Sequence, residues 1–253
     1  MNCMNIEVET LTLYHGSFNQ KGIPQPRRDI PGHTFGRIDM DFGTGFYLTP
    51  NANQAKEWAV RKGNNGSLNT YRLNIDGLHI LHLEPEACCP LCWMTVMLYF
   101  RGTRMQRRDK HWLIDNYYLD VDSYDLVCGL TADDQYYRIF NDFVTNQLSY
   151  RGLCKALLLG GLGRQYVIKS IKGYENLHFL NCNTVFSEIW LSRGSERHRI
   201  ANEQYDVIQQ QHCHSRDELF LADIISERIM PNDTRLAFKC QTDFDEHDDS
   251  PCP

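Results

Sequence analysis

Three short runs with the residue pattern of β-strands constrain the fold of this chain more than any other feature. They occupy residues 13–17, 45–49 and 164–168, so the third lies far along the chain from the first two. Each run presents one polar or aromatic side chain that a pocket could use, namely His15, Tyr47 and Gln165. Strands this short are not stable alone, and they predict sheet structure assembled from distant segments.

The rest of the chain up to residue 180 alternates between strand and helix patterns. Further strand patterns occupy residues 10–15, 70–75, 79–83, 124–128, 165–169 and 177–180. Helical spacing of apolar residues begins at Asn51 and recurs in residues 91–100, 133–144 and 152–159. In the helix over 133–144 we expect Tyr137, Phe140 and Val144 on one side. Residues 18–40 are rich in Pro and Gly and predict a long surface loop. Together these patterns predict an α+β fold.

Composition indicates a protein with a sizeable core. A chain of 253 residues buries roughly 70–75% of the surface that its unfolded form exposes. The ten cysteines are not accompanied by a signal-like N-terminus, which predicts reduced thiols in the cytoplasm. No apolar run approaches the length of about eighteen residues that a membrane helix needs. The net charge of −6 disfavours broad attraction to nucleic acid.

Charged residues are unevenly distributed along the chain. One basic cluster is either a solvated loop or a patch that faces a substrate, and it comprises Arg101, Arg104, Arg107, Arg108 and Lys110. Acidic residues crowd the end of the chain, which predicts a disordered tail over residues 241–253. Residues 183–240 carry apolar residues at helical spacing and predict a helical extension that covers the core or binds a partner.

The three strand-like runs, taken in order, resemble motifs of the ADP-ribosyltransferases. Residues 15–17 match the His-Gly-Ser element of the His-Tyr-Glu branch, which includes the poly(ADP-ribose) polymerases. Tyr47 matches the aromatic residue of the Gly-x-Tyr element, and Trp58 stands eleven residues on, where that branch has a second aromatic residue. Gln165 stands at the position of the Glu. The chain also resembles a bacterial family of formerly unassigned domains that looks derived from this branch, and the resemblance covers roughly residues 10–181.

The resemblance implies a split β-sheet core with flanking helices and NAD as co-substrate. It also implies roles: His15 holds a ribose, Tyr47 and Trp58 stack on the two sides of nicotinamide, and Gln165 aligns the reacting sugar. Breaking the glycosidic bond to nicotinamide passes through an oxocarbenium-like state, so fixing the ribose and the leaving ring is the main task of such a site. The residues that the resemblance assigns to NAD are His15, Gly16, Ser17, Tyr47, Trp58 and Gln165.

Two positions depart from the pattern of that branch. Gln165 offers no negative charge, and a charge-assisted hydrogen bond is roughly twice as strong as a neutral one, so polymer elongation is not expected. Ala55 stands where the branch has a Ser that bonds the nicotinamide amide. The resemblance therefore implies transfer of a single ADP-ribose to nucleic acid or protein, as in bacterial toxins and phage-defence effectors. The alternative is a catalytically silent module that binds NAD, ADP-ribose or a partner.

Metal and thiol chemistry receive weaker support from the sequence. Cys89 and Cys92 have ligand-like spacing, but no second Cys or His pair lies at finger spacing, and His212 and His214 are distant in sequence. We therefore expect no metal site. The domain organisation expected is an NAD-binding domain over residues 1–182, the helical extension over 183–240 and the acidic tail over 241–253. A neutralising or regulatory protein could bind the extension.

Overall fold

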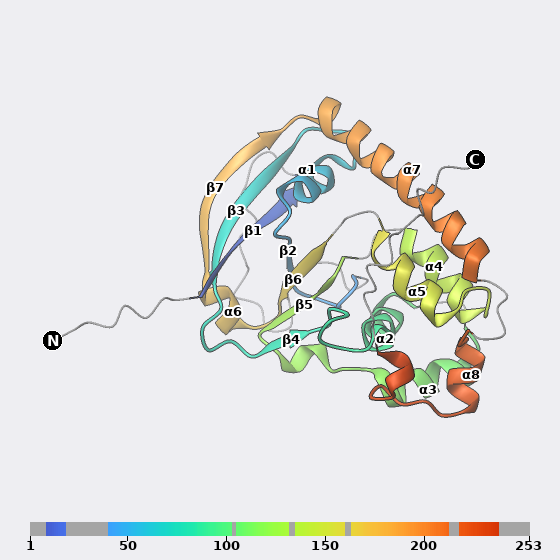
Figure 1. Cartoon of the computed structure of the whole chain (residues 1–253). Helices are drawn as coiled ribbons and strands as arrows, with labels where there is room; N and C mark the ends of the chain where they lie inside the picture. The colour runs from blue at the N-terminus through green and yellow to red at the C-terminus, as the bar shows by residue number, and fades with distance from the viewer. Residues whose placement is uncertain are drawn as a thin grey trace, which may run out of the picture.

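The computed structural model describes residues 9–18, 40–102, 105–131, 135–159, 163–212 and 218–237, and within them the chain has a mixed α and β fold with two sheets (Figure 1). The first sheet is antiparallel and has the order β1-β3-β7, with β1 Thr10–Ser17, β3 Gly66–Asn74 and β7 Leu177–Val185. The second has the order β2-β6-β5-β4, with β2 Phe46–Leu48, β6 Arg164–Ile168, β5 Leu126–Leu130 and β4 Ile80–His82. In the second sheet β4 and β5 are parallel, and the other neighbours are antiparallel.

The two sheets meet at a junction between β1 and β2. Tyr14 of β1 and Thr49, which follows β2, exchange backbone hydrogen bonds of 2.8 and 2.9 Å. Leu13, Phe46 and Ile168 then pack together in an apolar layer that is shared by both sheets. This sheet junction brings the first two strand-like runs of the sequence side by side.

Helix α1, Ala52–Val60, lies over β1 next to the sheet junction. Asn51 caps the helix, because its side-chain oxygen accepts hydrogen bonds from two backbone N–H groups of the first turn. The helix approaches β1 closely at Gly16, where an added Cβ would lie 1.9 Å from the carbonyl oxygen of Ala55. The absence of a side chain at this glycine is therefore required for the packing of α1 on β1.

One face of the second sheet packs against the first sheet, and helices cover its opposite face (Figure 1). Their bounds are α2 Pro90–Arg101, α4 Gln135–Val144 and α5 Tyr150–Ala156, and α3 Arg107–Tyr117 packs against α2. The larger apolar core lies between these helices and the sheet, and it contains Tyr47, Trp93 and Val167. A short helix, α6 Ile171–Glu175, precedes β7 and adds Tyr174 to the apolar layer between the sheets.

Helix α7, Ser187–His212, crosses from the end of the first sheet to helices α4 and α5 (Figure 1). Arg197 pairs with Glu57 of α1 at 2.9 Å, and the hydroxyl of Tyr205 donates to Asp142 of α4 at 2.7 Å. A last helix, α8 Leu221–Ser226, adds Leu221 to the larger core. No helix in the described part of the chain is both long and apolar enough to cross a membrane.

Most of the strands and helices expected from the sequence are present, with shifted ends. The strand predicted to stop before Gly16 continues through it to Ser17, and Gly129 lies inside β5 instead of closing it. On α4 the expected apolar side is wrong at Tyr137, which is 51% exposed, whereas Phe140 is buried together with Tyr136, Ile139 and Phe143, and Val144 packs against the same core. β7 runs past residue 182, where the sequence placed a domain boundary, to Val185.

Two helices were not expected from the sequence, α3 and α6. Helix α3 begins inside the basic cluster, where the charged residues conceal the helical spacing of the buried Leu113 and Tyr117. Helix α6 spans only five residues, too few to show a helical period. Most of the expected loop over 18–40, Asp133, and the acidic tail over 241–253 lie outside the described residues.

Candidate functional site at the sheet junction

The register of the strands brings His15, Tyr47 and Gln165 to adjoining strands. Tyr47 of β2 is opposite Val167 of β6, which is two residues from Gln165, so the side chains of Tyr47 and Gln165 leave the same face of the second sheet. His15 reaches β2 from β1, since its Nδ1 lies 2.8 Å from the backbone oxygen of Tyr47. The three residues that the sequence singled out therefore lie on adjoining strands, with Tyr47 and Gln165 on one face of the sheet and His15 beside Phe46 on the opposite face.

The contacts of His15 fix the form of its imidazole. The half-buried ring stacks on Phe46, with ring centroids 4.8 Å apart. Burial lowers the pKa of His15 below 6.5, and the hydrogen bond to the Tyr47 carbonyl opposes this only in part. The ring is therefore neutral at pH 7. Because a carbonyl oxygen only accepts, Nδ1 carries the hydrogen, and Nε2 is left as an acceptor for a hydroxyl group.

Tyr47 is held by the segment that precedes β2. Its hydroxyl donates to the backbone oxygen of Gly43 at 2.6 Å and accepts from the backbone N–H of Phe42 at 3.0 Å. The ring is 8% exposed and belongs to the core beneath α2, on the opposite face of β2 from Phe46 and His15. Burial raises the pKa of Tyr47 well above 10. In this arrangement the Tyr47 side chain braces residues 42–43 and does not face the imidazole.

Gln165 is one member of a buried polar chain. Its Nε2 donates to Asp41 at 2.8 Å and to the backbone oxygen of Leu130 at 3.1 Å. Asp41 in turn pairs with Arg101, the last residue of α2, at 2.6 Å. Both amide hydrogens of Gln165 are thus donated to protein groups, so its Oε1 is the atom that remains for a further hydrogen bond, as an acceptor. No pattern in the sequence connected Asp41 with Gln165.

Lys169 provides a second buried cation for the segment before β2. Its ammonium group donates to the backbone oxygens of Phe42 and Thr44, both at 2.7 Å, and pairs with Asp122 at 2.7 Å. Desolvation lowers the pKa of Lys169 from 10.5, although its bond to Asp122 acts against this effect. Arg101 and Lys169 therefore hold residues 41–44 in place beside the sheet junction.

Two buried polar atoms beside the junction have no hydrogen-bond partner among the described residues. Gln54 accepts a hydrogen bond from Thr49 at 2.5 Å through Oε1, but its Nε2 makes none. Asn69, opposite His15 on β3, donates to the backbone oxygen of His15 at 3.3 Å, but its Oδ1 accepts none. Most buried polar groups are hydrogen-bonded, so such an amide donor and amide acceptor indicate places for water or for polar groups of a ligand. No sequence signal marked Gln54 or Asn69.

The other residues assigned to NAD lie around α1. The space beside Gly16 is filled by the backbone of α1. Ser17 is the last residue of β1 and is paired with Ser67 of β3. Trp58 is half-buried on α1, one position before the fully buried Ala59. Two hollows in the described part lie between helices, one of them beside Arg101, and each holds only about 10 Å³, the room of one water. Neither has the size of a nucleotide site.

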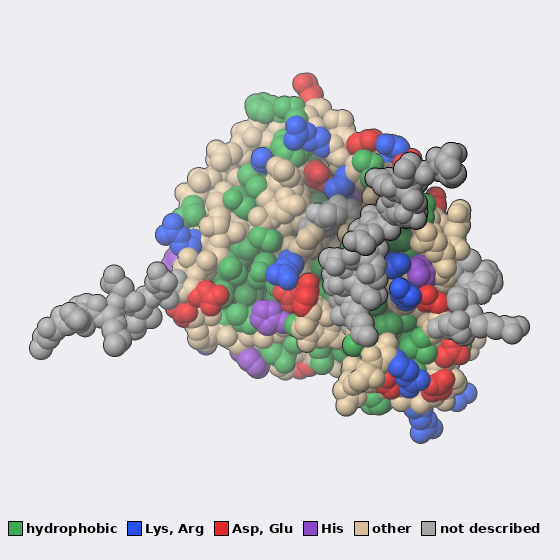
Figure 2. Space-filling view, viewed as in Figure 1, with side chains coloured by type: hydrophobic (Ala, Val, Ile, Leu, Met, Phe, Trp, Pro, Cys, Tyr) green, Lys and Arg blue, Asp and Glu red, His purple; other side chains and the backbone are tan. Residues whose placement is uncertain are grey.

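The basic cluster does not form one loop. Arg101 points inward to Asp41, whereas Arg107, Arg108 and Lys110 lie in the first turn of α3, and Arg104 is outside the described residues. Acidic and basic side chains are interspersed over the helical half of the face seen in Figure 2. The two arginines of α3 are exposed and are the ones that a partner could contact.

The cysteine pair noted in the sequence lies at the start of α2. Cys89 caps the helix and Cys92 is buried in its first turn. Hydrogen bonding, with the Cys92 thiol as its largest contribution, lowers the pKa of Cys89 to about 7, and the Tyr150 hydroxyl lies 3.6 Å from its sulfur. His212 is buried at the end of α7 and bonds Glu218 at 3.0 Å, while His214 is outside the described residues. The groups expected from the sequence thus do not form one metal site among the described residues.

The fold and the sheet junction define a class of protein: a two-sheet α/β domain with a buried polar cluster where the sheets meet. The family model for "Protein of unknown function (DUF3990)" matches residues 11–179, from β1 into β7. The chain belongs to this family, and the match includes His15, Tyr47 and Gln165. None of the curated proteins and none of the solved structures matches the chain.

Proposed function

We propose that this protein is a mono-ADP-ribosyltransferase of the His-Tyr-Glu type, which transfers one ADP-ribose from NAD to a macromolecular acceptor. The observation that carries the proposal is that His15, Tyr47 and Gln165 come from three distant segments and lie on the adjoining strands β1, β2 and β6, with His15 on one face of β2 and the other two side chains on the opposite face. The order and residue types of the motifs support the ADP-ribosyltransferase fold for the two-sheet core. The buried donor of Gln54 and the buried acceptor of Asn69 beside them are further support for a polar ligand at the sheet junction.

In the proposed mechanism the side chains position NAD and do not react with it covalently. The neutral His15 accepts a hydrogen bond from a ribose hydroxyl through Nε2. Gln165 accepts one from the reacting ribose through Oε1, with its amide group oriented by Asp41 and Leu130. Trp58 provides the aromatic face for nicotinamide, and Tyr47 keeps residues 42–43 in place. Positioning of this kind accelerates glycosidic cleavage because the ribose is held as its cationic character develops.

A second candidate function is a silent module that binds NAD or ADP-ribose without cleaving it. The state of Gln165 favours it, since the side chain is 2% exposed and has no negative charge to stabilise a cation-like sugar. Nicotinamide release separates the two candidates, because a silent module binds NAD and leaves it intact.

We further propose that the acceptor is nucleic acid or protein and that the enzyme acts as a bacterial toxin or phage-defence effector in the cytoplasm. The exposed Arg107 and Arg108 on α3 are the residues that would contact phosphates, whereas Arg101 is already paired with Asp41. A neutralising protein that covers α7 or α8 would account for survival of the host cell.

Labelled NAD tests the proposal directly. Purified protein is incubated with bacterial lysate and NAD labelled in the adenylate moiety, and the product is digested with protease or with nuclease. We expect label on one polymer and release of nicotinamide, both reduced at least tenfold by His15→Ala and left unchanged by the matched surface variant Asn53→Ala. Binding of intact NAD without nicotinamide release would instead support the silent module. Neither binding nor release in the folded protein would refute both candidates.

Expression in a bacterial host tests the effector role. We expect the wild-type chain to slow growth and His15→Ala to relieve the effect at equal protein levels. Growth that is equally slow with both chains would exclude NAD chemistry at the sheet junction as the cause.

A further inference from the structure

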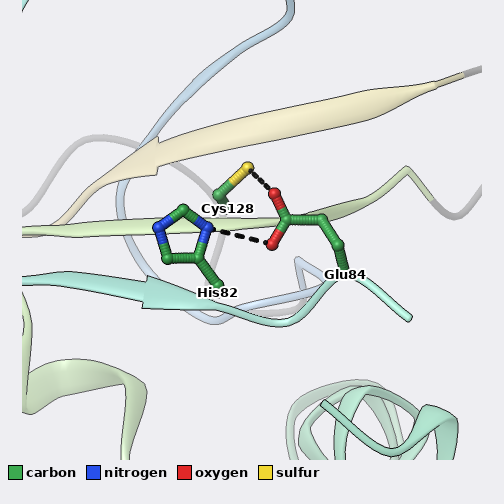
Figure 3. A group of neighbouring side chains, drawn as sticks. All are labelled: His82, Glu84 and Cys128. Atoms are coloured by element: carbon green, nitrogen blue, oxygen red, sulfur yellow. Dashed lines mark hydrogen bonds and ion pairs between the residues drawn. The ribbon is translucent and has the colours of Figure 1, made fainter. Parts of the chain in front are cut away.

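A second group of reactive side chains lies on the second sheet, outside the residues assigned to NAD. His82 at the end of β4, Glu84 just after it and Cys128 on β5 point toward one another (Figure 3). Glu84 lies between the other two: its Oε1 is 2.6 Å from the Cys128 sulfur, and its Oε2 is 3.2 Å from Nδ1 of His82. All the donor atoms lie within 4.8 Å of one another.

The backbone fixes this group. β4 and β5 are parallel, and His82 is the register partner of Cys128, so their side chains leave the same face of the sheet. Glu84 follows His82 by two residues, and its backbone oxygen accepts hydrogen bonds from the N–H groups of Ala87 and Cys88. The carboxylate therefore stands on a turn that is held in place. Three potential ligands from two adjacent segments are thus preorganised.

The distances suit a tetrahedral transition-metal ion. Zinc bonds of 2.0–2.3 Å to N, O and S place the donor atoms about 3.3–3.6 Å apart. The His82–Glu84 separation of 3.2 Å lies close to this range, and the contacts of His82 and Cys128 are made to different oxygens of Glu84. The Cys128–Glu84 contact of 2.6 Å has to widen by about 1 Å, which a side-chain rotation of Glu84 provides once the thiol proton that occupies the contact is lost.

Burial and charge make the group unusual for a plain hydrogen-bond network. Cys128 is completely buried and Glu84 is 5% exposed, whereas the imidazole of His82 reaches solvent. Among the residues that the structure describes, the Lys or Arg side chain paired with Glu84 is Arg164, whose Nε lies 3.8 Å away and whose guanidinium also approaches the exposed Glu86 at 3.7 Å. A buried carboxylate with so distant a counter-charge is stabilised by a cation placed directly against it.

We propose that His82, Glu84 and Cys128 form a binding site for a zinc-class divalent ion, with water from the solvent-facing His82 side as the fourth ligand. A thiolate, an imidazole and a carboxylate are ligands that zinc accepts, and three protein ligands with an open position give an exchangeable site. On binding, the Cys128 thiol releases its proton to solvent and its sulfur forms the bond to the metal. Arg164 then turns fully to Glu86.

The site neighbours the sheet junction through β6. Arg164 precedes Gln165, and Cys128 is paired in register with Tyr166. Metal binding that draws Glu84 away from Arg164 would therefore act on the strand that carries Gln165. The metal site does not depend on the proposed transferase activity, because binding is measured without NAD.

Cobalt(II) is the probe for the experiment, because thiolate ligation gives a strong near-ultraviolet charge-transfer band and tetrahedral geometry gives intense visible bands. Full-length, metal-free and reduced protein is titrated with cobalt(II) and then with zinc(II). We expect one equivalent of cobalt to produce both bands and zinc to abolish them. Cys128→Ser should lose the charge-transfer band, and His82→Ala should weaken cobalt binding at least tenfold.

The chain provides a matched control for its other thiols. The double variant Cys89→Ser/Cys92→Ser removes the pair at the start of α2 and should keep the bands of the wild-type protein. His82 is exposed, so His82→Ala keeps the test valid if Cys128→Ser fails to fold. A band that persists in Cys128→Ser, a band lost in the double variant, or an affinity unchanged by His82→Ala would each overturn the proposal.

Discussion

Removal of Arg101 should destabilise the protein far more than removal of any other residue of the basic cluster in the described part of the chain. Arg101 pairs with Asp41 at 2.6 Å, and the side chains are 24% and 3% exposed. Breaking a buried ion pair by removing one partner costs about 3–5 kcal/mol, because the other charge is left uncompensated. Since the Arg101 side chain is partly exposed, we expect Arg101→Met to cost about 3 kcal/mol, at the lower end of this range.

That loss corresponds to a clear shift in thermal unfolding. For a chain of this size, 1 kcal/mol lowers the midpoint by about 2–4 °C, so Arg101→Met should lower it by about 6–12 °C at pH 7. Arg107→Met on α3 is the matched control, since it removes the same charge from an exposed position and should change stability by less than about 0.5 kcal/mol. Circular dichroism during heating and urea titration measures both variants.

A double variant tests the cause of the loss. Asp41→Asn removes the uncompensated charge, and its side-chain oxygen still accepts the hydrogen bond from Gln165. We therefore expect Asp41→Asn/Arg101→Met to be more stable than Arg101→Met by about 1 kcal/mol or more, as expected when a buried charge is removed. If Arg101→Met and Arg107→Met unfold at the same temperature, the buried polar chain does not stabilise the fold and the reasoning is wrong.

Three further predictions concern the elements around the sheet junction. Gly16→Ala should lose about 1–3 kcal/mol of stability, measured by urea unfolding, because the added Cβ meets a carbonyl oxygen of α1. The control Gly194→Ala on α7, where no atom of the described residues would lie closer than 3.6 Å to the added Cβ, should gain up to about 1 kcal/mol from helix propensity. Equal effects of the two substitutions would contradict the close packing of α1 on β1. Burial lowers the pKa of His15 from 6.5, so the unfolded chain takes up this proton first as the pH falls, and stability declines below pH 6.5. His15→Asn should therefore lose less stability than the wild-type protein between pH 7.5 and 5.5. Identical pH profiles of stability would refute a neutral, buried His15. Asn51→Ala should cost about 1 kcal/mol through loss of the α1 cap, and the neighbouring variant Asn53→Ala, if it cost as much, would show that the cap is not the cause.

The sequence predicted the framework of this protein because its strands and buried helices carry a clear period. The runs at His15, Tyr47 and Gln165 are strands that adjoin one another, but the sequence did not reveal that His15 lies on the opposite face of β2 from Tyr47 and Gln165. Prediction was weakest where the hydrophobic period of a segment does not match the burial of its side chains. Helix α3 is polar on most sides, so its apolar period is weak. On α4 the neighbouring positions 136 and 137 are both tyrosines, so their identity does not indicate which one is buried, and tertiary packing decides it.

The side-chain partners at the site could not be predicted from the sequence. Asp41 and Arg101 are sixty positions apart in the sequence, and their pairing depends on where α2 ends relative to the sheet. The inward direction of the Tyr47 ring follows from the register of β2, which a three-residue strand does not specify by itself. His82, Glu84 and Cys128 show no ligand spacing because they meet only through the parallel pairing of β4 and β5.

The length of α7 has a consequence for how the molecule can be divided. A helix of 26 residues extends roughly 39 Å, and this one is attached to α1 by Arg197 and to α4 by Tyr205. These contacts link α1 on the first sheet to α4 beside the second sheet, so α7 limits motion of the two sheets relative to each other. A chain cut after residue 182 would lose α7 and the end of β7. We therefore expect such a fragment to be an incomplete folding unit and not a smaller functional domain.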